Sequence, residues 1–137
     1  MTSTRRTDPR RGPRTVAWLL LSGASLAAQA ASLFDLDVWM RSIDTRSVAV
    51  QRAIASGHYA QASEEARELE RLYGLTEAWF AHAGGTDDAV RIAHDGRALA
   101  AAIPPALEAG DAERARRAAV DIAHACNDCH DTYKPFK

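Results

Sequence analysis

The chain has 137 residues, with 17 basic and 18 acidic side chains, a formal net charge of −1 and 47% hydrophobic residues. This length is that of one domain. Residues 1–30 carry five Arg and one Asp, so residues 31–137 have 12 basic and 17 acidic residues and a net charge of −5. An acidic body argues against nucleic-acid binding. It is compatible with solubility or with steering toward a basic partner.

Residues 1–30 have the pattern of a signal peptide. Basic residues precede an apolar run from Val16 to Ala28, and Ala28-Gln29-Ala30 offers a small-residue cleavage site. We therefore predict a cleaved signal peptide over residues 1–30, a single domain over residues 31–137 and a periplasmic location in a bacterium. The apolar run is short for a membrane span, which needs about 20 residues. The alternative is an uncleaved N-terminal anchor. We expect the protein to associate with a membrane only in that case.

The first two predicted helices run from about Leu33 to Ser56 and from about Tyr59 to His82, each followed by glycine. Both have an apolar stripe with helical spacing, which predicts a face buried in a bundle. The first stripe consists of Leu36, Met40, Ile43, Val50 and Ile54, with Ser47 in the gap. The second consists of Ala62, Ala66, Leu69, Leu72, Trp79 and Phe80.

The third predicted helix opens at Thr86-Asp87-Asp88 and ends or kinks at Pro104-Pro105, because neither proline can donate a backbone hydrogen bond. Leu107 to Gly110 is then expected to form a turn. The residues expected to point inward are Val90, Ile92, Leu99 and Ile103.

The fourth predicted helix starts at the N-cap candidate Asp111 and continues to about Tyr133. Its inward stripe consists of Ala115, Ala119, Ile122, Cys126 and Cys129. No strand-like alternation is present in the sequence. Four helices with short connections predict an all-α fold, an antiparallel four-helix bundle.

The two cysteines of the chain lie in the pentapeptide Cys126-Asn127-Asp128-Cys129-His130. C-x-x-C-H is the signature for covalent attachment of a c-type haem, in which each thiol adds across a porphyrin vinyl group. On a helix the three side chains share one face. We predict one covalent haem c, attached to the last helix through Cys126 and Cys129, with His130 as the proximal axial ligand. A zinc site would need four ligands, and a redox C-x-x-C site would need a thioredoxin-like setting; both fit less well.

A four-helix exported domain with this motif on its last helix resembles the cytochrome c′ superfamily. The segment Cys126-Asn127-Asp128-Cys129-His130-Asp131-Thr132-Tyr133-Lys134 carries the resemblance, together with the preceding turn Glu108-Ala109-Gly110-Asp111. Members of that family commonly form a homodimer. Pro104-Pro105 departs from the usual family pattern, so for this chain the homodimer is one of the open alternatives. The resemblance implies redox partner proteins, with iron as the bound metal. It also implies one of two functions.

In one branch a methionine of the first helix is the distal iron ligand, and the protein transfers electrons. In the other branch an apolar side chain covers a five-coordinate iron that binds nitric oxide or carbon monoxide. Met40 is the one methionine besides the initiator, so we predict it as the distal ligand of a low-spin electron-transfer cytochrome. Ile43 competes for the same space, and in that case the protein binds or senses gas.

The remaining polar residues are weaker candidates. Four other histidines could be proposed as ligands, but a lone helical histidine is more often on the surface; they are His58, His82, His94 and His124. Arg41, Arg46 or Lys134 could pair with a haem propionate, although a solvated helix face is the simpler explanation. No nucleophile–base pair or nucleotide motif is present in the sequence, so we do not predict an enzyme.

Overall fold

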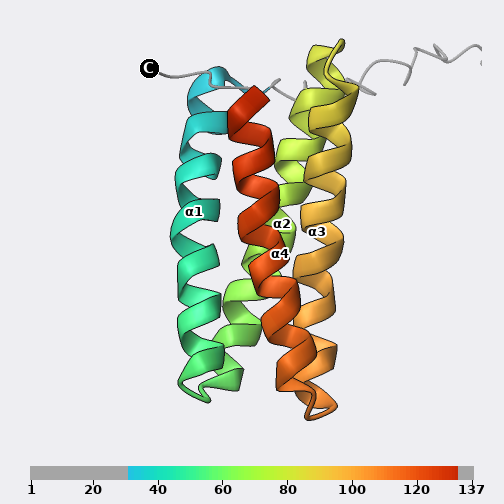
Figure 1. The fold of residues 1–137 in the computed structure, drawn as a ribbon. Coiled ribbons are helices and arrows are strands. Elements are labelled where there is room, and N and C mark those ends of the chain that lie inside the picture. The colour runs from blue at the N-terminus through green and yellow to red at the C-terminus, as the bar shows by residue number, and fades with distance from the viewer. Residues whose placement is uncertain (1–30, 133–137) are drawn as a thin grey trace, which may run out of the picture.

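The computed structural model describes residues 31–132, and these form four α-helices and no strand. The helices are α1 (Leu33–Ala55), α2 (Tyr59–Ala83), α3 (Asp87–Glu108) and α4 (Ala112–Thr132). They run alternately down and up, so each is antiparallel to the one before it (Figure 1). Each helix packs against the next one in the chain, and α4 also packs against α1. The prediction of an all-α antiparallel four-helix bundle is therefore confirmed.

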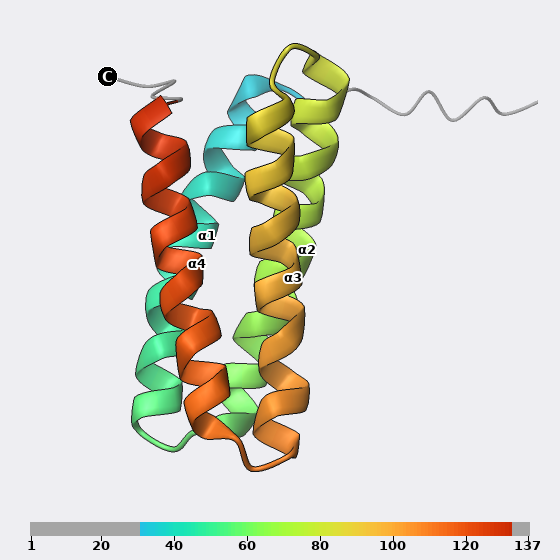
Figure 2. The same ribbon diagram turned by 45° about the vertical axis from the view of Figure 1, so that its right-hand side comes forward.

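The four helices do not contact one another equally. The contact between α2 and α3 is the most extensive, and that between α1 and α4 is the least extensive. The N-terminus of α1 and the C-terminus of α4 lie at the same end of the bundle (Figure 2). The signal peptide predicted over residues 1–30 lies outside the described residues. Within residues 31–132, no helix is long and apolar enough to cross a membrane.

Side-chain caps fix where α1 and α4 begin. Ser32 and Asp35 form a capping box, in which the Asp35 N–H donates to the Ser32 hydroxyl at 3.2 Å and the Ser32 N–H donates to the Asp35 carboxylate at 2.7 Å. At α4, the Arg114 N–H donates to the Asp111 carboxylate at 2.9 Å, so the predicted N-cap is confirmed. These bonds satisfy backbone donors that have no partner within the helix.

The predicted apolar stripes of α1, α2 and α4 supply most of the core. Met40 and Trp79 are partly buried, and Cys126 and Cys129 lie at the edge of the core. The other members of the three stripes are buried: Leu36, Ile43, Ser47, Val50, Ile54, Ala62, Ala66, Leu69, Leu72, Phe80, Ala115, Ala119 and Ile122. The hydrophobic spacing of these helices therefore predicted their inner faces well.

The predicted C-terminal end of the third helix is wrong. Pro104 and Pro105 lie inside α3, and the helix continues to Glu108, so the expected turn does not begin at Leu107. Proline removes a backbone donor and crowds the preceding turn. Here the last turn buries Pro104, Ala106 and Leu107, and the Ala109 N–H still donates to the Pro105 carbonyl at 3.0 Å. Burial of apolar surface thus holds the helix together beyond the prolines.

The predicted inner face of the third helix is only part of the observed one, because Val90 and Leu99 pack at the edge of the core. Ile103 is buried as expected, but Val90, Ile92 and Leu99 are only partly buried. The buried positions are instead small residues: Ala89, Ala93, Gly96 and Ala100. Small side chains let α3 lie close to α2, and there the large side chains of α2 fill the space between the helices.

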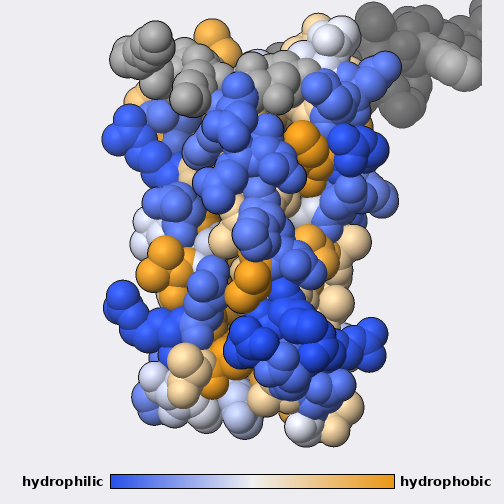
Figure 3. Space-filling view, in the orientation of Figure 1, coloured by the Kyte–Doolittle hydropathy of each residue, from blue (hydrophilic) through white to orange (hydrophobic). Residues whose placement is uncertain are grey.

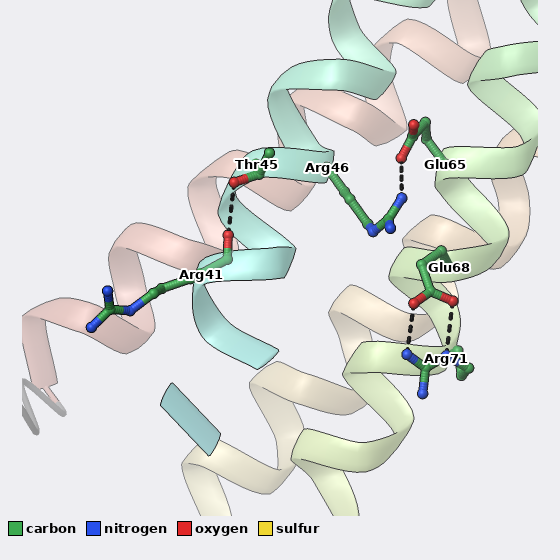
Figure 4. Close-up of polar contacts among 6 residues, drawn as sticks. All are labelled: Arg41, Thr45, Arg46, Glu65, Glu68 and Arg71. Carbon is green, nitrogen blue, oxygen red and sulfur yellow. Dashed lines mark hydrogen bonds and ion pairs between the residues drawn. The ribbon is translucent and has the colours of Figure 1, made fainter. Parts of the chain in front are cut away.

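Polar side chains cover most of the face seen in Figure 3, where hydrophobic residues form small separate patches. Ion pairs join some of the polar groups (Figure 4). Arg46 of α1 bonds Glu65 of α2 at 2.5 Å, and Arg71 makes a bidentate pair with Glu68 at 2.6 and 2.8 Å. The first of these pairs ties two neighbouring helices together, although partly exposed pairs of this kind add little to stability.

Candidate haem site

The antiparallel order of the helices brings the cysteine motif to a cavity that all four helices line. The motif lies at the end of the bundle that holds the first turns of α1 and α3 and the last turns of α2 and α4 (Figure 1). The cavity is lined by Met40, Ile43, Asp44, Tyr73, Thr76, Phe80, Ala89, Ile92, Ala93, Ala125, Cys126, Cys129 and His130. The predicted attachment and ligand residues from opposite ends of the chain therefore meet at one place.

Cys126, Cys129 and His130 share the inward side of the last turns of α4. Both cysteines are free thiols and partly buried, while His130 is exposed at the rim of the cavity. Burial raises the pKa of both thiols. For Cys126, the hydrogen bond with Tyr73 opposes this rise in pKa, and so does the nearby hydroxyl of Ser47, although its geometry is not that of a hydrogen bond. The two thiols thus lie beside an apolar interior, where burial favours their neutral form.

Met40 and Ile43 reach the same cavity from α1. Ile43 is almost fully buried, with 2% of its surface exposed. Met40 is partly buried and packs with Leu36, Phe80 and Ala89. The structure therefore brings together both candidates for the space opposite His130, and it leaves the choice between them open.

The chemistry of the lining residues fits a c-type haem, whereas the enclosed space is small. Two thiols, an imidazole and a thioether face one cavity, and these groups are the attachment and axial ligands of haem c proteins. The cavity volume is about 30 Å³, which is room for roughly two water molecules. A porphyrin is much larger, so side chains and helices must move apart to admit it. The contact between α1 and α4, two of the helices that line the cavity, is the least extensive in the bundle.

The other predicted candidates lie away from the cavity. The four remaining histidines are exposed, and His94 is 3.2 Å from the carboxylate of Glu77. Arg41 pairs with Asp37 at 2.8 Å and Arg46 with Glu65, so both guanidinium groups already have carboxylate partners. Lys134 lies outside the described residues. Phe80 does line the cavity, and Trp79 packs edge-on against it with 5.1 Å between ring centroids, an arrangement that aromatic pairs favour.

The sequence prediction missed two polar residues that flank Cys126. The hydroxyl of Tyr73 lies 3.4 Å from the Cys126 sulfur. Ser47, predicted only to fill a gap in the α1 stripe, is 6% exposed, and its hydroxyl has no hydrogen-bond partner in the part of the chain described. A heptad register on α2 would have found Tyr73, because Ala66, Leu69, Tyr73, Thr76 and Phe80 are spaced 3, 4, 3 and 4 and are all buried.

Comparison with known proteins identified no relative of this chain. No protein-family model matches the chain, and no curated protein or solved structure matches it. Among residues 31–132, no three His, Cys, Asp or Glu side chains are arranged to hold a metal ion. The function must therefore be argued from the cysteine motif and from the residues that share its cavity.

Proposed function

We propose that this protein is an exported c-type cytochrome that transfers single electrons through one haem bound covalently at Cys126 and Cys129. The observation that carries the proposal is the meeting of the C-x-x-C-H motif and Met40 at one apolar cavity. When bound, the haem would supply a one-electron ferric–ferrous couple. The four-helix architecture and the motif on α4 also support membership of the cytochrome c′ superfamily.

Each cavity residue has a defined task in this proposal. The i, i+3 and i+4 spacing places Cys126, Cys129 and His130 on one face of α4, so a haem held by the two cysteines would have the imidazole of His130 available as an iron ligand. Met40 would supply the second axial ligand from α1, and a thioether ligand raises the reduction potential. The apolar neighbours exclude water, which further favours the less charged iron site of the reduced state.

A second function, binding of nitric oxide or carbon monoxide, is favoured by the position of Ile43. Its side chain is buried in the same cavity, about one turn from Met40. If Ile43 covers the iron, the metal is five-coordinate and high-spin.

Visible spectra of the purified haem protein distinguish the two functions. We expect a low-spin ferric spectrum with a thioether-to-iron charge-transfer band and slow or absent carbon monoxide binding by the ferrous form. Met40→Ala should remove that band and open the iron to carbon monoxide, while Ile43→Ala, on the same helix face, should retain it. A high-spin ferric spectrum with rapid carbon monoxide binding in the unmutated protein would refute Met40 ligation and favour gas binding.

A further inference from the structure

We propose that Tyr73 is a positioning residue for the haem, holding the Cys126 sulfur by an O–H···S hydrogen bond that the phenol donates. This inference rests on the proposed haem attachment and extends it to α2, which supplies none of the predicted ligands. The phenol oxygen lies 3.4 Å from the Cys126 sulfur. Hydrogen bonds to sulfur are long and weak individually, so the surroundings must hold the two groups in place.

The packing of α3 fixes the position of the Tyr73 ring. Tyr73 is 5% exposed, and Gly96 of α3 lies directly against its ring. A Cβ atom at position 96 would come within 2.6 to 3.0 Å of three ring atoms, closer than side chains normally pack. The absence of a side chain at Gly96 therefore lets the ring lie deep enough for its hydroxyl to reach Cys126.

The direction of the hydrogen bond follows from the chemistry of attachment. In the free protein either the phenol or the thiol can donate. Attachment adds the Cys126 S–H bond across a vinyl C=C bond: an S–C and a C–H bond form, the π bond is lost and no electron is exchanged. The resulting thioether has no proton, so it can only accept. Burial raises the pKa of Tyr73 far above its usual value, and the phenol therefore keeps the proton that it donates.

Ser47 gives independent support for a polar contact at this sulfur. It lies on α1, and its hydroxyl is buried without a partner in the described part of the chain. Its effect is to lower the pKa of the Cys126 thiol, against the larger effect of burial. Hydroxyl groups from two different helices thus lie near a sulfur whose other neighbours are apolar. A buried hydroxyl lowers stability unless it has a hydrogen-bond partner.

The test compares Tyr73→Phe with the wild type after expression with a haem attachment system. The variant keeps the ring and loses only the hydroxyl, so we expect it to fold. Loss of one neutral hydrogen bond corresponds to about a fivefold change in the ratio of correctly placed to misplaced sulfur. We expect peptide mass mapping to show several-fold more chains attached only through Cys129. We also expect a lower reduction potential, because a donor facing the haem edge favours the electron-rich ferrous state.

Two control variants separate positioning from stability. Tyr59→Phe removes a hydroxyl from an exposed tyrosine, and Ile103→Val removes one methylene group from the core far from the cysteines. Both should match the wild type in attachment and potential. The inference is overturned if either property is unchanged in Tyr73→Phe, or if Ile103→Val changes them equally. A wild-type chain without covalent haem would refute the proposed function, whereas a normally attached wild type with an unaffected Tyr73→Phe refutes this inference alone.

Discussion

Replacing Gly96 by alanine sets helix propensity against packing, and the structure predicts which effect is larger. In a helix interior, Gly→Ala normally stabilises by about 1 kcal/mol. At position 96 the new Cβ atom would lie 2.6 Å from one ring carbon of Tyr73 and 2.7 Å from the next. Ordinary contacts are 3.4–4 Å, so the ring or the helix must move by about 1 Å. Overpacking of this kind costs about 1–3 kcal/mol.

The packing cost should exceed the gain in helix propensity here. The Tyr73 ring is buried and its hydroxyl is held at Cys126, so it has little freedom to move away. With a packing cost in the upper part of that range and a propensity gain of about 1 kcal/mol, we expect the free energy of unfolding to fall by about 1–2 kcal/mol. For a domain of this size, the melting temperature should then fall by roughly 5–10 °C.

Gly74→Ala is the matched control, since Gly74 also lies in a helix interior. Its added Cβ atom would meet only the flexible Arg97 side chain, at 3.8 Å. We expect this variant to gain about 0.5–1 kcal/mol. Urea unfolding of both variants, followed by circular dichroism, gives the comparison. The packing argument fails if Gly96→Ala is as stable as Gly74→Ala.

Three further outcomes are expected. Asp111→Ala should lower the free energy of unfolding by about 1 kcal/mol, because the Arg114 N–H loses its cap; unchanged urea unfolding would contradict this. Hydrogen bonds from the Ser32 side chain and backbone lower the pKa of Asp35. The stability that Asp35 contributes is therefore present above its unfolded pKa and is lost as the pH falls below about 4. The protection factors of the amides at the start of α1, which are corrected for the intrinsic pH dependence of exchange, should therefore fall in acid, and much less so in Ser32→Ala. Ile122→Ala should destabilise by about 2–5 kcal/mol, since Ile122 is fully buried; a melting temperature equal to that of the wild type would disprove this.

Hydrophobic spacing predicted the helices because an apolar stripe repeats wherever a helix faces a core. On α3 it found Ile103 but missed the small buried residues Ala89, Ala93, Gly96 and Ala100. Hydrophobicity favours the bulkier Val90 and Leu99, but close approach to α2 requires small residues. Which face is inside therefore depends on the neighbouring helix, and no single-helix pattern contains that information.

The candidate site was predictable where its residues form a local motif or where the sequence offers a single residue of the required type. The cysteine motif is one pentapeptide, and Met40 is the one methionine apart from the initiator. Tyr73 lies 53 residues from Cys126, and only the closed packing of the bundle, in which α2 and α4 each pack against both α1 and α3, places it there. The prolines of α3 were misjudged for a similar reason, because the local cost of Pro104 is offset by its burial in the core.

The intact mass of the protein tests the central claim most directly. The chain should be expressed with its first 30 residues in a host that attaches haem c, next to a Cys126→Ala, Cys129→Ala double variant. We predict a wild-type mass equal to that of the polypeptide plus one haem, unchanged by denaturation and acid extraction, and a double variant without covalent haem. A wild-type mass equal to that of the bare polypeptide, in a host that matures a control cytochrome c, would contradict the account.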